Sequence, residues 1–156
     1  MRRTRLHTLH TASDADTERF GAALGVRITR GLTVCLCGPL GAGKTVLVRG
    51  MCRGLGVKGG IVSPTFILME MMRGDTLEIA HIDLYRLEHE RELEEIGVFD
   101  LLHGDTVVLA EWGERSPALL DAADAVIRIE PDAQGGRAIR VDAGEDAAAQ
   151  LGDAAW

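Results

Sequence analysis

The chain has 156 residues and a mass of 16.8 kDa, which is the usual size of a single domain. Hydrophobic residues make up 46% of the sequence and charged residues 26%, a balance that predicts a packed globular domain and excludes a disordered chain. The formal net charge of -7 argues against a broad basic surface that binds nucleic acid unaided. Any link to RNA is therefore expected to run through a partner protein.

Targeting signals and cysteines both point to the cytoplasm. No apolar run approaches the length of a membrane span, and residues 1–14 lack the apolar region of a secretory signal. Cys35 and Cys37 alternate along an apolar segment, so they point to the same side of a strand. Because a metal site lacks nearby ligands, we interpret them as small core residues of a cytoplasmic protein without membrane contact.

The first half of the chain predicts two strands and two helices. Ser13, followed by two aspartates, is typical of a helix start because short oxygen side chains accept hydrogen bonds from the first free amides. The apolar run 32–37, bounded by glycines, is too short for most helices and predicts a buried central strand. The expected elements are a strand at 3–10, a helix from 13 to about 24, the strand at 32–37, and a helix after residue 45 that stops at Gly54 and Gly56.

The second half predicts a hairpin, a surface helix and three more strands. Segments 66–72 and 77–83 flank Arg73-Gly74-Asp75, which indicates a β-hairpin. The acidic, amphipathic segment 87–96 predicts a surface helix, whose acidic face is either simply solvated or a docking surface for a basic partner. Strands are expected at 106–110, 125–130 and 137–142, and the alanine-rich acidic segment 143–156 is expected to be a frayed helix or a tail.

An uninterrupted phosphate-binding motif, GPLGAGKT, occupies residues 38–45 between the buried strand and the following helix. Its glycines let backbone amides approach phosphate oxygens, and the helix N-terminus adds partial positive charge. Lys44 is expected to bridge the β- and γ-phosphates, and Thr45 to offer its hydroxyl to Mg2+. The residues expected to hold the nucleotide in this segment are Gly38, Leu40, Gly41, Ala42, Gly43, Lys44, Thr45 and Val46.

The fold class that follows is α/β. Residues 1–142 are expected to form a single P-loop NTPase domain, with a mostly parallel central sheet flanked by helices and a β-hairpin after the P-loop helix. Residues 143–156 are expected to form a C-terminal tail.

The charged residues narrow the choice of nucleotide and of metal ligands. GTPases recognise guanine through an Asn/Thr-Lys-x-Asp segment, but the lysines of this chain are Lys44, in the loop, and Lys58, which precedes two glycines. ATP is therefore the expected nucleotide. Magnesium also needs a carboxylate at the end of a buried strand beside the loop. Glu111 and Asp83 each end a predicted strand, and both remain candidates on this reasoning.

Five segments in this order resemble the TsaE (formerly YjeE) family, the small bacterial ATPases of tRNA threonylcarbamoyladenosine synthesis. They are the P-loop, SPTF (63–66), HIDLYRLE (81–88), ELEEIGVFDLL (92–102) and VLAEWGE (108–114). The resemblance spans about 13–137. It implies an ATPase that supports turnover of a complex with TsaD-like and TsaB-like proteins, which modify the adenosine beside the anticodon. The chain would then reach tRNA only indirectly, through that complex.

The resemblance also implies roles for individual residues. Lys44 and Thr45 would be the P-loop lysine and the magnesium hydroxyl, and Glu111 the second magnesium ligand. Asp83 would orient or activate the attacking water, directly or through the metal's other ligands. Thr65 would lie in a switch-like segment near the γ-phosphate. The implied catalytic residues are thus Asp83, Lys44 and Thr65.

Four other positions bear on the nucleotide. Trp112 resembles the family tryptophan beside the site, with a core aromatic as the alternative. Val46 stands where many relatives carry a second hydroxyl, so one contact to the α-phosphate is missing, and Gly113 stands where many carry proline, which loosens the turn. Arg137 follows a glycine pair as in relatives; we interpret it as a surface arginine, with a nucleotide contact as the alternative. Segment 11–14 is a candidate part of the adenine pocket, although no motif secures it.

Two other functions remain open. One is a small-molecule phosphotransferase (kinase), although a hairpin follows the P-loop helix where kinases usually carry an arginine-rich lid and acceptor-binding helices. The other is a non-hydrolysing assembly factor that uses ATP only as a structural ligand.

Overall fold

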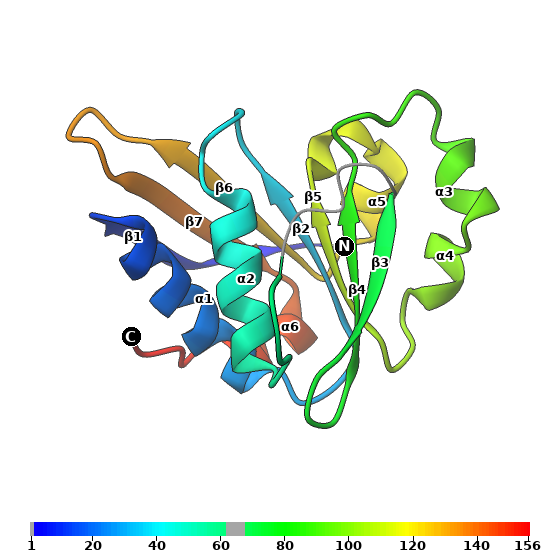
Figure 1. Cartoon of the computed structure of the whole chain (residues 1–156), viewed down its shortest axis with the longest axis horizontal. Helices are drawn as coiled ribbons and strands as arrows, with labels where there is room; N and C mark the ends of the chain where they lie inside the picture. Colours follow the sequence, from blue (N-terminus) through cyan, green and yellow to red (C-terminus); the bar gives the residue numbers. More distant parts are fainter. Residues whose placement is uncertain (1, 62–67) are drawn as a thin grey trace.

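The computed structural model describes residues 2–61 and 68–156, which form one α/β domain built on a seven-stranded sheet (Figure 1). The strands lie in the order β1-β7-β6-β2-β5-β4-β3. Their bounds are β1 (Thr4–Thr11), β2 (Leu32–Cys37), β3 (Met69–Arg73), β4 (Glu78–Asp83), β5 (Val107–Glu111), β6 (Ala125–Pro131) and β7 (Arg137–Ala143).

The centre of the sheet is parallel and its two sides are antiparallel. Strand β2 pairs in parallel with β5 and β6, and β5 pairs in parallel with β4. Strand β7 runs antiparallel between β6 and β1, and β3 and β4 form the expected antiparallel hairpin. Every residue of β2 and of β5 is buried, as a strand covered on both faces requires. The predicted fold class is confirmed.

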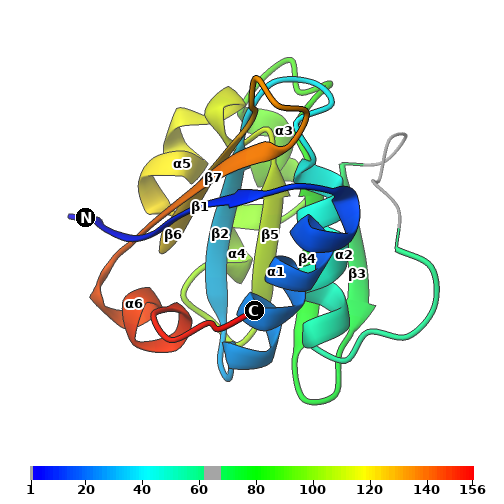
Figure 2. The ribbon, with the colours of Figure 1, turned by 90° about the vertical axis from the view of Figure 1, so that its left-hand side faces the viewer.

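Helices cover both faces of the sheet (Figure 2). One core cluster joins the sheet to α1, α2 and α6, and a second joins the opposite face to α3, α4 and α5. The helix bounds are α1 (Asp14–Arg27), α2 (Lys44–Gly54), α3 (Arg91–Glu95), α4 (Val98–Leu101), η1, a 3-10 turn (Gly113–Arg115), α5 (Pro117–Ala122) and α6 (Glu145–Leu151). Within the described part of the chain, no helix is long and apolar enough to cross a membrane.

Helices α1 and α2 pack closely because glycines stand where they cross. Ser13 caps α1, as predicted, by accepting a hydrogen bond from the Asp16 amide at 3.1 Å. A Cβ atom on Gly21 of α1 would clash with the backbone of α2, and a Cβ on Gly50 of α2 would clash with the backbone of α1. This tight contact fixes the direction of α2, and hence where its N-terminus points.

The predicted surface helix over 87–96 is wrong in extent. Only α3 (Arg91–Glu95) is helical there, and Gly97, with φ 79°, turns the chain into the short α4. The Glu92 carboxylate accepts hydrogen bonds from the amides of Glu88 and His89, and these two residues lie outside the helix. Glu90 accepts hydrogen bonds from Ser116 and from the Ala118 amide. Part of the acidic charge therefore serves the fold itself.

The second half of the chain contains elements that the sequence did not predict. These are the helices α4 and α5 and the turn η1. Segment 143–156, expected to be a frayed helix or a tail, contains α6, whose Ala147 and Leu151 are buried in the core beneath α1.

The cysteines are small core residues, as expected. Cys35, Cys37 and Cys52 are free and buried. Cys35 and Cys37 face the same core cluster. Burial raises the pKa of each thiol to about 12, so all three stay protonated at neutral pH.

Candidate functional site

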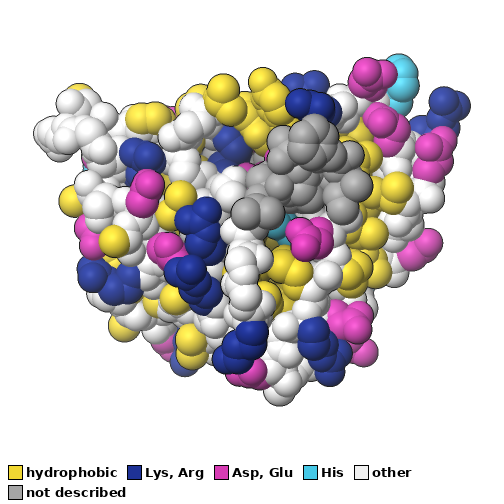
Figure 3. Space-filling model, in the orientation of Figure 1, with side chains coloured by type: hydrophobic (Ala, Val, Ile, Leu, Met, Phe, Trp, Pro, Cys, Tyr) yellow, Lys and Arg dark blue, Asp and Glu magenta, His cyan; other side chains and the backbone are white. Residues whose placement is uncertain are grey.

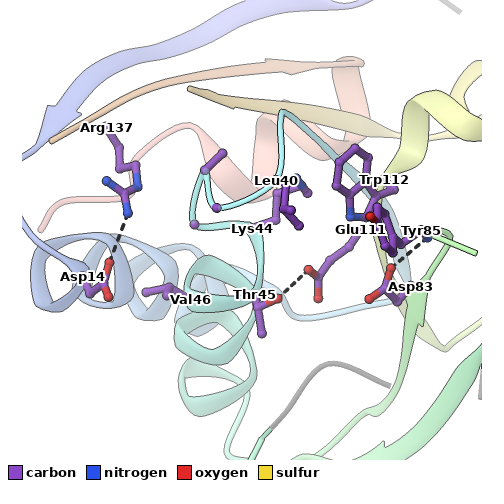
Figure 4. Close-up of a pocket in the computed structure, with 13 residues that line it drawn as sticks. Asp14, Leu40, Lys44, Thr45, Val46, Asp83, Tyr85, Glu111, Trp112 and Arg137 are labelled. Atoms are coloured by element: carbon purple, nitrogen blue, oxygen red, sulfur yellow. Dashed lines mark hydrogen bonds and ion pairs between the residues drawn. The ribbon is translucent and has the colours of Figure 1, made fainter. Parts of the chain in front are cut away.

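The phosphate-binding loop joins the end of β2 to the start of α2 and forms one wall of a cavity of about 430 Å3 (Figure 4). Gly43 precedes α2 in a left-handed conformation, φ 106°, and no side chain in residues 2–61 and 68–156 caps the first amides of the helix. These amides and the helix dipole are therefore available to an anion in the cavity. A volume of this size lies in the range of nucleotide-sized ligand pockets.

The structure brings nearly all of the predicted site residues to this cavity. Each predicted nucleotide or metal residue within the described ranges lines it, except Gly38. Thr65, and the SPTF segment around it, lie outside the described residues. Asp14, Tyr85 and Arg137 also line the cavity. Asp14 belongs to the segment 11–14 that the sequence offered as part of the adenine pocket, whereas Tyr85 was not identified as a site residue.

Lys44 lies in the cavity wall, held by neutral groups. Its Nζ donates hydrogen bonds to the carbonyl oxygens of Gly38, at 2.5 Å, and Pro39, at 2.8 Å. The same atom lies 3.9 Å from the centroid of the Trp112 ring, a cation–π contact. Burial lowers the pKa of Lys44, while the Glu114 and Glu111 carboxylates act in the opposite direction. Carbonyl and ring partners of this kind are weaker than a phosphate, so a bound anion would compete well for this ammonium.

Glu111, at the end of β5, is held at both carboxylate oxygens. Thr45 Oγ1, in the first turn of α2, donates to Glu111 Oε1 at 2.6 Å. His81 Nε2, on β4, lies 2.6 Å from Glu111 Oε2, and we assign the ring nitrogen as the donor because a carboxylate oxygen accepts. Both Glu111 and His81 are buried. A hydroxyl and a carboxylate in direct contact form a pair of hard oxygen ligands of the kind that Mg2+ prefers.

Asp83 ends β4 directly beside Glu111, because the two residues are partners in the parallel register of β4 and β5. Its Oδ1 accepts a hydrogen bond from the Tyr85 amide at 2.9 Å. The two acidic candidates thus lie at the same carboxyl edge of the sheet, where open α/β sheets bind their ligands. Glu111 accepts the hydrogen bond from the Thr45 hydroxyl.

The amino-acid sequence shows which protein family the chain belongs to. The family model described as "Threonylcarbamoyl adenosine biosynthesis protein TsaE" matches residues 11–139. The chain belongs to the TsaE family.

Curated TsaE proteins are about 40% identical to this chain over the residues that align. The tRNA threonylcarbamoyladenosine biosynthesis protein TsaE of Treponema pallidum is 38% identical over 129 residues, which covers 83% of this chain and 95% of that protein. The protein of the same name from Haemophilus influenzae is 40% identical over 107 residues, covering 69% of this chain and 68% of that protein.

A solved structure shows the same fold. Bacillus subtilus YdiB superimposes with a TM-score of 0.75 at 22% sequence identity, covering 94% of this chain and 90% of that one. At this identity the likeness concerns the fold alone.

In this TsaE-family chain, Trp112 lies in the cavity wall as well as against the core. Its backbone is left-handed, φ 59°, which is uncommon for a residue with a side chain and is often found at functional sites. The ring lies 5.1 Å from that of Tyr85 and packs in part against the core cluster of α3, α4 and α5. Gly113 lets the following turn approach closely, since a Cβ there would lie 2.6 Å from that of Cys35.

Sequence reasoning missed His81 and Glu114. His81 precedes Asp83 by two residues on β4, so both side chains lie on the same face of the sheet, toward α2. From this spacing, His81 could have been predicted to lie beside the acidic pair. Glu114 Oε1 accepts a hydrogen bond from the Gly38 amide at 3.2 Å. No local pattern identifies that contact, because it joins η1 to the start of the loop.

The interpretation of Arg137 as a surface residue is wrong. Its side chain is only 21% exposed and lines the cavity, where Nη2 lies 3.5 Å from Asp14 Oδ1. Arg137 begins β7, which runs antiparallel beside β6 and so brings its first residue to the loop end of the sheet. Asp14 belongs to the segment 11–14 that was a candidate part of the adenine pocket.

Proposed function

We propose that this TsaE-family chain is a magnesium-dependent ATP hydrolase that acts in tRNA threonylcarbamoyladenosine synthesis. The observation that carries the proposal is the contact of Thr45 with Glu111, at 2.6 Å, in the cavity wall that also holds Lys44. A hydroxyl, a buried carboxylate and an ammonium at the N-terminus of one helix are the parts by which P-loop enzymes hold a magnesium nucleotide.

The residues present fit ATP and Mg2+ in their donor chemistry. The uncapped amides of α2 and the Lys44 ammonium would bind the β- and γ-phosphates, with Lys44 exchanging the carbonyls of Gly38 and Pro39 for phosphate oxygens. Thr45 and Glu111 would hold the cation, which supplies neutralisation of phosphate charge during transfer to water. Glu111 is the better candidate for the direct ligand because it accepts a hydrogen bond from the Thr45 hydroxyl.

Asp83 would then act on the water. It lies next to Glu111 in the register of β4 and β5 and lines the same cavity, so its carboxylate is suited to orient a water and to accept its proton. Its hydrogen bond with the Tyr85 amide holds the carboxylate in place. Thr65 remains a proposed neighbour of the γ-phosphate.

The proposed partners are TsaD-like and TsaB-like proteins, with tRNA reached only through them. The family to which the chain belongs supports a place in this pathway. The net charge of -7 supports indirect contact with tRNA, as does the mixture of acidic and basic side chains on the face drawn in Figure 3.

The test is hydrolysis of Mg-ATP by the purified chain, alone and with TsaB-like and TsaD-like proteins from one organism. We expect slow release of phosphate by the chain alone and faster release in the mixture. Transfer of the γ-phosphate to a small acceptor, without any effect of the partners, would favour a phosphotransferase. Tight ATP binding with no hydrolysis in a single-turnover experiment on the assembled complex would favour an assembly factor.

A further inference from the structure

One face of the antiparallel strands β6, β7 and β1 carries charged side chains outside the two core clusters. On β7, Ile139 and Val141 belong to the cluster beneath α1 and α2, so Arg140 and Asp142, which alternate with them, lie on the opposite face. Among the described residues, the core cluster on that opposite face reaches β6 at Val126 and includes no residue of β7 or β1. In Figure 2, β1 and β7 lie at the near edge of the sheet.

Three arginines converge on one carboxylate of this face. Asp142 accepts hydrogen bonds from Arg5 Nε at 3.4 Å, Arg128 Nη1 at 3.3 Å and Arg140 Nε at 3.2 Å. Strand register brings them together, because Asp142 is the partner of Arg5 on β1 and Arg140 is the partner of Arg128 on β6. We call these four residues the arginine face. Three positive charges and one negative charge leave an excess of two positive charges, on a chain whose formal net charge is -7.

Most of the hydrogen-bonding capacity of the three guanidinium groups is unused. Within residues 2–61 and 68–156, each group makes the single bond to Asp142. The aspartate side chain is 16% exposed, whereas those of Arg128 and Arg140 are 41% and 40% exposed, so the remaining N–H donors reach solvent. A hollow of about 250 Å3 lies beside these two arginines and is also lined by Thr8, Glu130, Ala138 and Ile139. The arginine face therefore offers both free donors and room for a ligand group.

The chemistry of this face favours protein carboxylates over a nucleic acid. A planar guanidinium binds a carboxylate through two parallel N–H donors. Glu130 lines the same hollow, and Asp132, just after β6, pairs with His10 at 3.3 Å. These acids confine the positive charge to a few side chains, whereas a nucleic-acid strand needs an extended basic track. The acidic chain as a whole also repels a long polyanion.

We propose that the arginine face binds a short acidic segment of a partner protein. The carboxylates of that segment share the guanidinium groups with Asp142, which holds the three arginine side chains together in the unbound chain. None of the four residues lines the cavity beside the phosphate loop, so the segment binds without entering that cavity. This inference goes beyond the proposed function, and it holds whether or not the cavity binds a nucleotide.

The test is the binding of a fluorescently labelled oligo-glutamate peptide to the whole chain, measured by anisotropy at low ionic strength. We expect the original chain to bind this peptide, to bind it less as salt is added, and not to bind an oligo-glutamine peptide of the same length. Arg128→Gln and Arg140→Gln should each weaken binding by roughly three- to tenfold, as expected for the loss of one partly exposed ion pair. Thermal unfolding of each variant checks that the fold is retained, and either variant that folds carries the test.

Arg73→Gln is the matched control. Arg73 ends β3 on the far side of the sheet, where it is 67% exposed and pairs with Glu78 at 3.6 Å. The substitution removes the same charge outside the arginine face, so affinity for oligo-glutamate should stay within about twofold of the original.

Asp142→Asn should change the affinity in the opposite direction. The amide keeps the shape of the side chain but removes the carboxylate that competes for the guanidinium groups. We expect this variant to bind oligo-glutamate roughly three- to tenfold more tightly than the original chain. Unchanged or weaker binding, in a variant that keeps its fold, would mean that the arginines serve only to hold Asp142, and would overturn the proposal.

Three other results would also overturn it. One is an original chain that does not bind oligo-glutamate at low ionic strength. Another is an equal loss in Arg73→Gln and Arg128→Gln, which would show attraction to the charge of the chain in general. The third is binding of tRNA, lost in Arg128→Gln and Arg140→Gln, by a chain that does not bind oligo-glutamate, which would make the arginine face a nucleic-acid contact.

Discussion

Thr45 Oγ1 donates a hydrogen bond to Glu111 Oε1 at 2.6 Å, although 66 residues separate the two positions in the chain. The contact joins the first turn of α2 to the end of β5. Since His81 occupies the other oxygen of the same carboxylate, Glu111 is fixed in one orientation before any ligand arrives. Because these groups are already held in place, the binding of a cation does not have to order them first.

Glu111→Gln should weaken the dependence on magnesium with little effect on the fold. Glutamine keeps an oxygen that can accept from Thr45 but removes the negative charge that attracts the cation. We expect the Mg2+ concentration at half-maximal nucleotide affinity to rise at least about tenfold. Calorimetric titration of ADP at a series of Mg2+ concentrations measures this half-maximal concentration.

Glu114→Gln is the matched control for that experiment. Glu114 lies beside the loop, bonded to the Gly38 amide, but makes no contact with Thr45 that the structure records among the described residues. Its Mg2+ dependence should be that of the original chain. If Glu111→Gln also titrates like the original chain, the direct magnesium ligand must be Asp83.

Asp83→Asn should separate binding from hydrolysis. The amide keeps the shape of the carboxylate and can still accept from the Tyr85 amide, but it cannot take a proton from water. We expect nucleotide affinity to change by less than about threefold, while hydrolysis falls by roughly a hundred- to ten-thousandfold, the usual contribution of a general base. Phosphate release under single-turnover conditions gives the rate, and a rate equal to that of the original chain would remove Asp83 from the catalytic step.

His81→Ala should destabilise the fold by about 1–3 kcal/mol, because Glu111 Oε2 would lose its donor in a buried position. His81→Gln restores a donor at a similar distance and should recover part of this loss. Urea unfolding measures both variants. His10→Ala, at a side chain 69% exposed, is the control and should change stability by less than about 0.5 kcal/mol. Equal losses in the alanine and glutamine variants would mean that His81 only fills space.

The three buried thiols predict a loss of stability in alkaline solution. Each thiol has a pKa of about 12 in the folded chain, against 9.0 for an unperturbed thiol, so the folded state holds protons that the unfolded state releases between these values. The free energy of unfolding should therefore be unaffected by the thiols below about pH 9 and fall as the pH rises from there toward 12.

Thiol reagents offer an independent check on the cysteines. At pH 8 the native chain should not react with a thiol-specific reagent, whereas the chain in denaturant should react at Cys35, Cys37 and Cys52. Rapid labelling of the native chain would show that burial does not protect these side chains.

Local patterns in the sequence were sufficient for the features whose cause is local. The loop 38–45 needs its glycines and its Lys-Thr pair in one continuous segment, so its place between a strand and a helix was predictable. Strands such as β2 follow from an unbroken apolar run, and the start of α1 follows from the hydrogen bond that Ser13 makes three residues ahead. Glu111 and Asp83 were predictable as strand ends, and parallel pairing brought them to one edge.

Contacts between distant segments were decided only by the tertiary structure. His81 meets Glu111, Glu114 meets Gly38, and Arg137 enters the cavity beside Gly43, because sheet order and the close crossing of α1 and α2 bring these segments together. The helix at 87–96 was overestimated for a different, local reason. The Glu92 carboxylate accepts hydrogen bonds from the amides of Glu88 and His89, and these bonds compete with helical ones. The sequence by itself therefore determined the phosphate loop and the acidic strand ends. Packing alone decided which partners surround them, since those contacts depend on residues far apart in the chain.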